Sequence, residues 1–135
     1  MSERENEQFV RRWIAEAWNQ RNEEVVRQGF HPEAIAHLEG TEDARGPEAL
    51  LGQFRLLFGA FPDIHVVIDD LIAKDDVVVM RWSFTGTHLG DSLGPPTGRA
   101  VAADGLTWMR FRDGQMVEGW DRWNQGLLLQ RLQVP

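Results

Sequence analysis

Hydrophobic positions follow two different spacings, which divide the chain into a helical first part and a stranded second part. Up to residue 61, apolar residues recur every three or four positions, a period that predicts amphipathic helices. The two clearest stripes are Phe9, Val10, Trp13, Ile14, Ala17 and Trp18, followed later by Leu50, Leu51, Phe54, Leu57, Phe58 and Phe61. From residue 64 onward the apolar residues tend to alternate with polar ones, which predicts β-strands.

Capping residues and helix breakers agree with this division. Three helices are predicted, each with its own start signal. The signals are a capping box at Ser2 and Glu5, an N-cap at Asn22 with a stop at Gly29, and a third helix that begins at Gly46-Pro47 and stops at Phe61-Pro62.

The second part of the chain reads as a series of extended segments. Strands are predicted at residues 35–38, 64–73, 77–88, 99–112 and 115–124. Asp113-Gly114 favours a tight hairpin between the last two strands. Residues 89–98 form a loop rich in glycine and proline, expected to close the mouth of a pocket. The tail, residues 125–134, fits either a closing helix or an extended flap.

Helices followed by a meander of long strands predict an α+β architecture, with one domain spanning residues 1–135. Strands of about a dozen residues are longer than usual and must twist and curl. A curved, mostly antiparallel sheet packed on the N-terminal helices would make a cone that holds a pocket.

One acid in the last strand requires an explanation. If residues 115–124 alternate strictly, Val117, Gly119, Asp121 and Trp123 share one face. A lone carboxylate on an apolar face is costly unless it is paired or protonated. Asp121 is therefore either a buried acid with a raised pKa or the partner of a cation such as Arg122.

The opposite face of the sheet is expected to be an interface. On strict alternation it carries Met116 and Trp120, together with Met80 or its neighbours. Such an apolar surface would be exposed in a monomer, which favours a homodimer with that face buried.

Composition excludes several classes of function. The net charge is −7 with the acids scattered along the chain, so no basic stripe is present for nucleic acid. The chain has no cysteine and no tyrosine, and its four histidines lack metal-ligand spacing; we therefore expect no metal and no cofactor. The charged N-terminal segment and the absence of a long apolar run predict a cytoplasmic protein without a membrane segment.

Three segments taken together resemble the SnoaL-like polyketide cyclases (ester cyclases), which have the nuclear transport factor 2-like (NTF2-like) cone fold. The segments are RWSFTGTHLG at residues 81–90, GPPTGR at residues 94–99 and FRDGQMVEGWD at residues 111–121. The resemblance extends from about residue 13 to residue 132. It implies the cone fold described above and a ligand site inside the cone.

The resemblance also implies roles for individual residues. In these cyclases an aspartate on the last strand is the general acid/base of an intramolecular aldol closure, and Asp121 matches it. His37 matches a histidine facing the same cavity, where it would position substrate or shuttle a proton; the alternative is a histidine bonded to the backbone. Asp104 is either a second pocket acid or a residue that points to solvent. The remaining candidates to line the site are Trp82, Trp108 and Trp123, with His88 at its rim.

The function that follows is a small enzyme that cyclises or isomerises a hydrophobic, polyketide-like carbonyl compound. Other reactions of this fold use a tyrosine or an Arg-x-Asp triplet, and the sequence contains neither. The alternative is a non-catalytic module of the same fold that binds a small molecule or associates into dimers.

Overall fold

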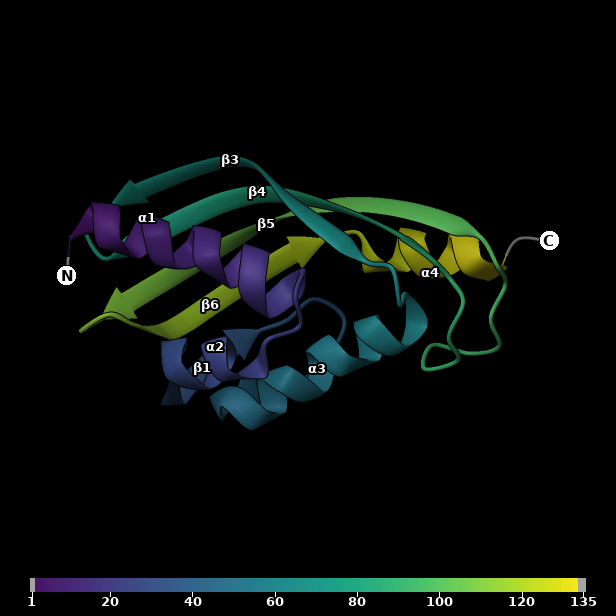
Figure 1. Ribbon diagram of the computed structural model, residues 1–135, viewed down its shortest axis with the longest axis horizontal. Helices are drawn as coiled ribbons and strands as arrows, with labels where there is room; N and C mark the ends of the chain where they lie inside the picture. Colours follow the sequence, from purple (N-terminus) through teal and green to yellow (C-terminus); the bar gives the residue numbers. More distant parts are fainter. Residues whose placement is uncertain (1, 134–135) are drawn as a thin grey trace.

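The curved sheet is the frame on which the other elements are placed (Figure 1). The structure is a computed structural model that describes residues 2–133. Its helical elements are α1 (Glu3–Arg12), which continues into a π-helical turn η1 (Trp13–Trp18), α2 (Glu23–Gly29), α3 (Gly46–Ala60) and α4 (Gln125–Gln133). Its strands are β1 (Phe30–His37), β2 (Ala44–Arg45), β3 (His65–Lys74), β4 (Val77–Thr87), β5 (Ala100–Arg112) and β6 (Gln115–Trp123).

The six strands form one sheet in the order β2-β1-β6-β5-β4-β3. All neighbouring strands are antiparallel except β1 and β6, which run parallel. Helices α1, α2 and α3 lie on one side of the curved sheet, and α4 lies beyond the end of β6 (Figure 1). The predicted α+β cone, with its curved, mostly antiparallel sheet packed on N-terminal helices, is thereby confirmed.

Local signals in the sequence account for the helix starts. The Ser2 hydroxyl accepts from the backbone N–H of Glu5 at 3.1 Å, and the Glu5 side chain accepts from the backbone N–H of Ser2 at 3.3 Å. The Asn22 side chain accepts from the N–H of Glu24 at 3.2 Å at the start of α2. Each of these contacts satisfies a backbone donor that the helix cannot satisfy itself.

The core lies between the helices and the inner face of the sheet. Helix residues Val10, Trp13 and Phe54 are buried against strand residues such as Met80 and Phe84. The inner face of the sheet is therefore the face that carries Met80, Trp82 and Phe84 of β4. The residues that pair with them on the neighbouring strands lie on the same face. None of the described helices is long and apolar enough to cross a membrane.

A β-bulge in β6 corrects the expected faces of the sheet. Phe111 pairs with Met116, but the preceding residue Arg110 pairs with Glu118, so Val117 is an extra residue in β6. A bulge of this kind reverses the alternation on either side of it. Met116 is thus on the inner face and only 4% exposed. The placement of Met116 on the outer face was therefore wrong; Met80 is also buried in the core, and on β4 its neighbour Val79 pairs with the exposed Ile72 and Trp108 of the outer face.

Candidate active site

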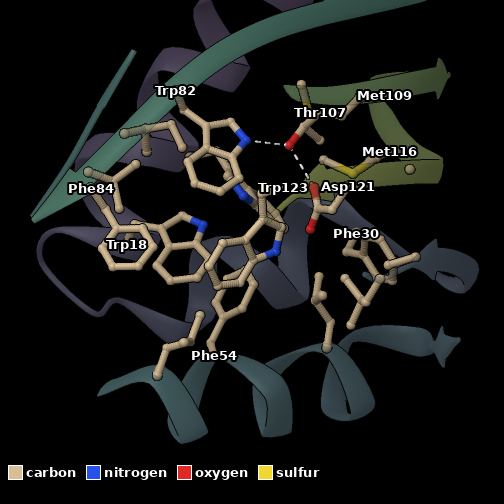
Figure 2. Close-up of a pocket in the computed structure, with 18 of the residues that line it drawn as sticks. Trp18, Phe30, Phe54, Trp82, Phe84, Thr107, Met109, Met116, Asp121 and Trp123 are labelled. Atoms are coloured by element: carbon tan, nitrogen blue, oxygen red, sulfur yellow. Dashed lines mark hydrogen bonds between the residues drawn. The ribbon is translucent and has the colours of Figure 1, made fainter. Parts of the chain in front are cut away.

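An apolar cavity opens between the helices and the inner face of the sheet. Its volume is about 100 Å³. Aromatic side chains from five elements line most of it, among them Trp18, Phe30, Phe54, Trp82 and Trp123 (Figure 2). Within the described part of the chain, Asp121 is the one charged residue that lines this cavity. An apolar pocket with few convergent polar groups is the usual form of a small-molecule site.

Asp121 is held in the cavity by a short chain of hydrogen bonds. The Thr107 hydroxyl donates to Oδ1 of Asp121 at 2.6 Å, and the indole Nε1 of Trp82 donates to the same hydroxyl at 2.8 Å (Figure 2). The threonine hydroxyl has one proton. The hydroxyl oxygen already accepts a hydrogen bond from Trp82, and its single proton is donated to Asp121. The second carboxylate oxygen points into the cavity between Trp123 and Phe30 (Figure 2).

The surroundings of Asp121 make its carboxyl group a weaker acid than that of an exposed aspartate. Burial among apolar side chains raises its pKa from 3.8 to about 6, and the nearby charge of Glu39 acts in the same direction. The hydrogen bond from Thr107 and the charge of Arg122 lower the pKa but do not outweigh burial. The predicted raised pKa is confirmed, and a carboxyl group of this strength is suited to exchanging protons near neutral pH.

The bulge at Val117 is what directs Asp121 inward. An unbroken hairpin register from the Asp113-Gly114 turn would pair Thr107 with Trp120 and place Asp121 on the outer face. The extra residue shifts the pairing by one position, so that Thr107 pairs with Asp121. Bulges re-aim side chains in this way next to functional sites.

Thr107 was missed by the sequence reading. Its position opposite Asp121 follows from the shifted register, which the sequence does not display. One signal in the sequence could have indicated it. Thr107 lies two residues from both Gly105 and Met109, so strict alternation places it on the same apolar face of β5 as these residues.

His37 lies outside the cavity, which contradicts its predicted role. In β1 the neighbours Ala36 and Leu38 line the cavity, so the intervening His37 points to the opposite face. There its ring nitrogens contact Glu118 at 2.7 Å and Asp43 at 3.0 Å. The hydrogen bond to Glu118 and the contact with Asp43 raise the pKa of His37.

Asp104 and Trp108 are also on the outer face, and neither touches the cavity. Trp108 is 46% exposed and pairs with Trp120 on β6. Asp104 pairs with Ser83 and lies in a separate open groove beside α4, which Arg131 also lines. The assignment of Trp108 to the cavity was wrong, and of the two alternatives for Asp104 the solvent-facing one holds, because β5 presents Thr107 and Met109 to the cavity and the alternating residues face outward.

His88 is a buried structural residue and not part of a cavity rim. It is 1% exposed, and its Nδ1 accepts from the backbone N–H of Thr97 at 3.2 Å. Its backbone N–H also donates to the carbonyl oxygen of Arg99 at 2.9 Å. His88, at the start of the loop that follows β4, therefore holds the end of that loop, at Thr97 and Arg99, close to its beginning. Of the predicted site residues, the structure brings together Asp121, Trp82 and Trp123.

Comparisons with known proteins identify the family and the fold. The family model described as SnoaL-like polyketide cyclase matches residues 8–132. No curated protein matches the chain. Among solved structures, a candidate SnoaL-like polyketide cyclase from Jannaschia sp. CCS1 is 25% identical with a TM-score of 0.90, over 98% of this chain and 94% of that one.

Two further solved structures come from Streptomyces. IdmH, a candidate polyketide cyclase from Streptomyces antibioticus, is 31% identical with a TM-score of 0.82, over 96% of this chain and 99% of its own. AclR, a candidate hydroxylase from Streptomyces galilaeus, is 29% identical with a TM-score of 0.85, over 99% of this chain and 100% of its own. By sequence and by its NTF2-like fold, the chain belongs to the SnoaL-like polyketide cyclase family.

Proposed function

We propose that the chain is an enzyme in which Asp121 removes a proton from carbon in a hydrophobic carbonyl compound and returns it to oxygen or to another carbon of the same molecule. The observation that carries this proposal is a single acid with a pKa of about 6 inside an apolar cavity. A general base works best when its pKa is near the working pH. The reaction class is an intramolecular aldol closure or an isomerisation through an enolate.

In the cyclisation, the carboxylate of Asp121 removes a proton from the carbon next to a carbonyl group. The resulting enolate attacks a second carbonyl carbon of the same molecule, so one carbon–carbon bond forms. Asp121, now protonated, returns the proton to the new alkoxide. The proton balance closes within one turnover, and no redox co-reactant is consumed. In an isomerisation the proton returns to a different carbon.

Thr107 positions the base for this step. Its hydrogen bond holds one carboxylate oxygen at 2.6 Å, which leaves the other free for substrate. Trp82 and Trp123 pack edge to face, with ring centroids 5.9 Å apart, and would contact the flat rings of a conjugated substrate. Conjugation spreads the enolate charge over the substrate itself, so the site needs few hydrogen-bond donors.

Exchange of α-protons for deuterium tests the proposal without knowledge of the substrate. The model compound is 2-tetralone, a neutral bicyclic ketone, incubated with protein in D₂O and followed by NMR. Wild-type protein is expected to accelerate exchange above the buffer rate. Asp121→Asn should lose at least about a hundredfold of that acceleration, the usual contribution of a general base.

Asp104→Asn is the matched control, because Asp104 is an acid on the neighbouring strand that lies outside the cavity. It should exchange at the wild-type rate. If wild-type protein binds 2-tetralone and Asp121→Asn binds it equally, but neither accelerates exchange, the chain is a binding module and the catalytic proposal is wrong.

A further inference from the structure

The cavity continues into a polar mouth beyond Asp121. This outer space has a volume of about 80 Å³ and shares Asp121 and Trp123 with the inner cavity. Its polar side chains are Glu39, Thr41, Gln53 and Gln125. Asp121 therefore lies at the junction of an apolar interior and a polar opening.

Glu39 is fixed at this mouth by the end of the sheet. β1 ends at His37 while β6 continues to Trp123, so the last N–H of β6 has no strand partner on that side. The Glu39 carboxylate accepts from this N–H of Trp123 at 3.3 Å. Among residues 2–133, no lysine, arginine or histidine forms an ion pair with Glu39.

The charges of the site are all of one sign. Glu39 and Asp121 are the charged residues lining the cavity and its mouth in the described chain, and both are acids. The nearest arginine in sequence, Arg122, is exposed and donates to the backbone carbonyl of Asp121, not to its side chain. The charge of Arg122 does reach Asp121 and lowers its pKa, but in the described chain no cationic side chain lines the cavity or its mouth, so an anion entering this space would meet two carboxylates and no lining cation.

We propose that Glu39 and Asp121 together make this site reject anions, so that its ligand is a flat ring system carrying a neutral hydrogen-bond donor or a cation at the mouth end. A free carboxylate or phosphate at that end is excluded; a primary or secondary amide, a hydroxyl or an amine, each of which can donate to a carboxylate, is accepted. The carboxylate of Glu39 and the side-chain amides of Gln53 and Gln125 are the partners of such a group.

The dimensions of the site limit the part of the ligand that is enclosed. Engineered cavities of about 150 Å³ hold one benzene ring. The inner space of about 100 Å³ and the adjoining mouth of about 80 Å³ are on the scale of one aromatic ring. The remainder of a larger ligand lies outside the mouth. This inference rests on the proposed function only in taking the cavity as the ligand site.

Three naphthalene probes of equal size test the inference. They are 2-naphthalenemethanol, which is neutral, 2-naphthylmethylamine, which is a cation at pH 7.5, and 2-naphthoate, which is an anion. Binding is measured by calorimetry and by quenching of tryptophan fluorescence. Wild-type protein should bind the alcohol and the amine at least about tenfold more tightly than the carboxylate, a modest effect for charges in a poorly screened site.

Two variants at the mouth identify the source of the selectivity. Glu39→Gln should reduce the preference for the alcohol over the carboxylate by at least about threefold. Glu42→Gln, an exposed acid of the same loop that does not line the mouth, should leave the preference unchanged. Thr41→Lys places a cation at the mouth and should bring 2-naphthoate to the affinity of the alcohol. Because Thr41 is exposed, this variant is informative even if Glu39→Gln fails to fold.

Equal or tighter binding of 2-naphthoate by wild-type protein would overturn the inference, as would failure of all three probes to bind. The proposed function fails by a different observation, the absence of α-proton exchange in 2-tetralone. Selective binding without exchange would leave anion rejection standing and remove the catalytic role of Asp121.

Discussion

The carboxyl group of Asp121 is less acidic than an exposed aspartate because its neighbours are mostly apolar. Burial raises its pKa to about 6, against 3.8 for the free side chain. The unfolded chain therefore releases this proton at a lower pH than the folded one. Between about pH 4 and pH 6 the folded state loses stability as the pH rises, and above pH 6 the full cost persists.

Asp121→Asn should consequently stabilise the fold at pH 7. The amide avoids the burial of a charge, and its oxygen can still accept from Thr107. We expect a gain of about 2 kcal/mol, with the full pKa shift corresponding to about 3 kcal/mol as an upper bound. Urea unfolding at several pH values measures this gain, which should vanish near pH 4. An Asn variant less stable than wild type at pH 7 would indicate a structural ion pair instead.

Thr107 is predicted to set the pH range over which Asp121 acts. Its hydrogen bond favours the ionised carboxylate, so Thr107→Val should raise the pKa of Asp121 further. The midpoint of the pH profile for 2-tetralone exchange should move upward by about one unit, the value of one hydrogen bond to a charged group. Thr107→Ser keeps the hydroxyl and should retain the wild-type midpoint. A Val variant with lower activity but an unchanged midpoint would reduce Thr107 to a packing residue.

The sequence identifies Asp121 but not the residues that act with it. An acid beside a tryptophan in an apolar strand is visible as an anomaly without any structure. Its partner Thr107 depends on the register between β5 and β6, which the bulge at Val117 shifts. His37 was assigned to the cavity from the family resemblance and lies outside it, while for Asp104 the two faces of its strand could not be told apart from the sequence.

At the scale of elements, the sequence predicts type and order well and misses short or shifted segments. The predicted strands at residues 77–88 and 99–112 agree with β4 and β5 to within one residue. β1 begins five residues earlier than residue 35, and the two-residue strand β2 was not predicted. Both belong to the edge formed by β1 and β2, where pairing with distant segments overrides local preference.

Gly105 in β5 controls how closely the tryptophans of the cavity approach the sheet. A Cβ at this position would lie 2.6 Å from the Trp82 ring, 2.7 Å from the Trp123 Cβ and 2.8 Å from the Arg122 carbonyl oxygen. Gly105→Ala should therefore destabilise the fold by about 1 to 3 kcal/mol, the usual cost of overpacking. Thermal unfolding and tryptophan fluorescence report the change.

Gly52 provides the matched comparison for Gly105. It lies in the middle of α3, and a Cβ there meets nothing within 4 Å. Gly52→Ala should stabilise the protein by about 0.5 to 1 kcal/mol, because alanine loses less backbone freedom in a helix than glycine does. Equal effects of the two substitutions would show that steric contact at Gly105 is not the deciding factor.

At the scale of the whole molecule, helices α1, α2 and α3 pack on the inside of the curved sheet, and in residues 2–133 much of its outside is exposed. The outer face displays Val67, Ile72, Leu106 and Trp108, which are 46%, 65%, 51% and 46% exposed. The register aligns Ile72, Val79, Trp108 and Trp120 in one row across four strands. The sequence predicts an apolar outer face and names Trp120, Met116 and Met80 or its neighbours for it; Met116 is misplaced because strict alternation was assumed through the bulge in β6.

We expect this outer face to be the interface of a homodimer. Large apolar side chains in one row are costly in water, and a two-fold axis would bury the same row on both copies. Light scattering at micromolar concentration should give twice the chain mass. Trp108→Glu places a charge in the row and should yield monomers, while binding of 2-naphthalenemethanol in the cavity on the opposite face persists. Asp104→Asn, which removes a charge from the same face, should remain dimeric. A wild-type mass equal to one chain would contradict the prediction.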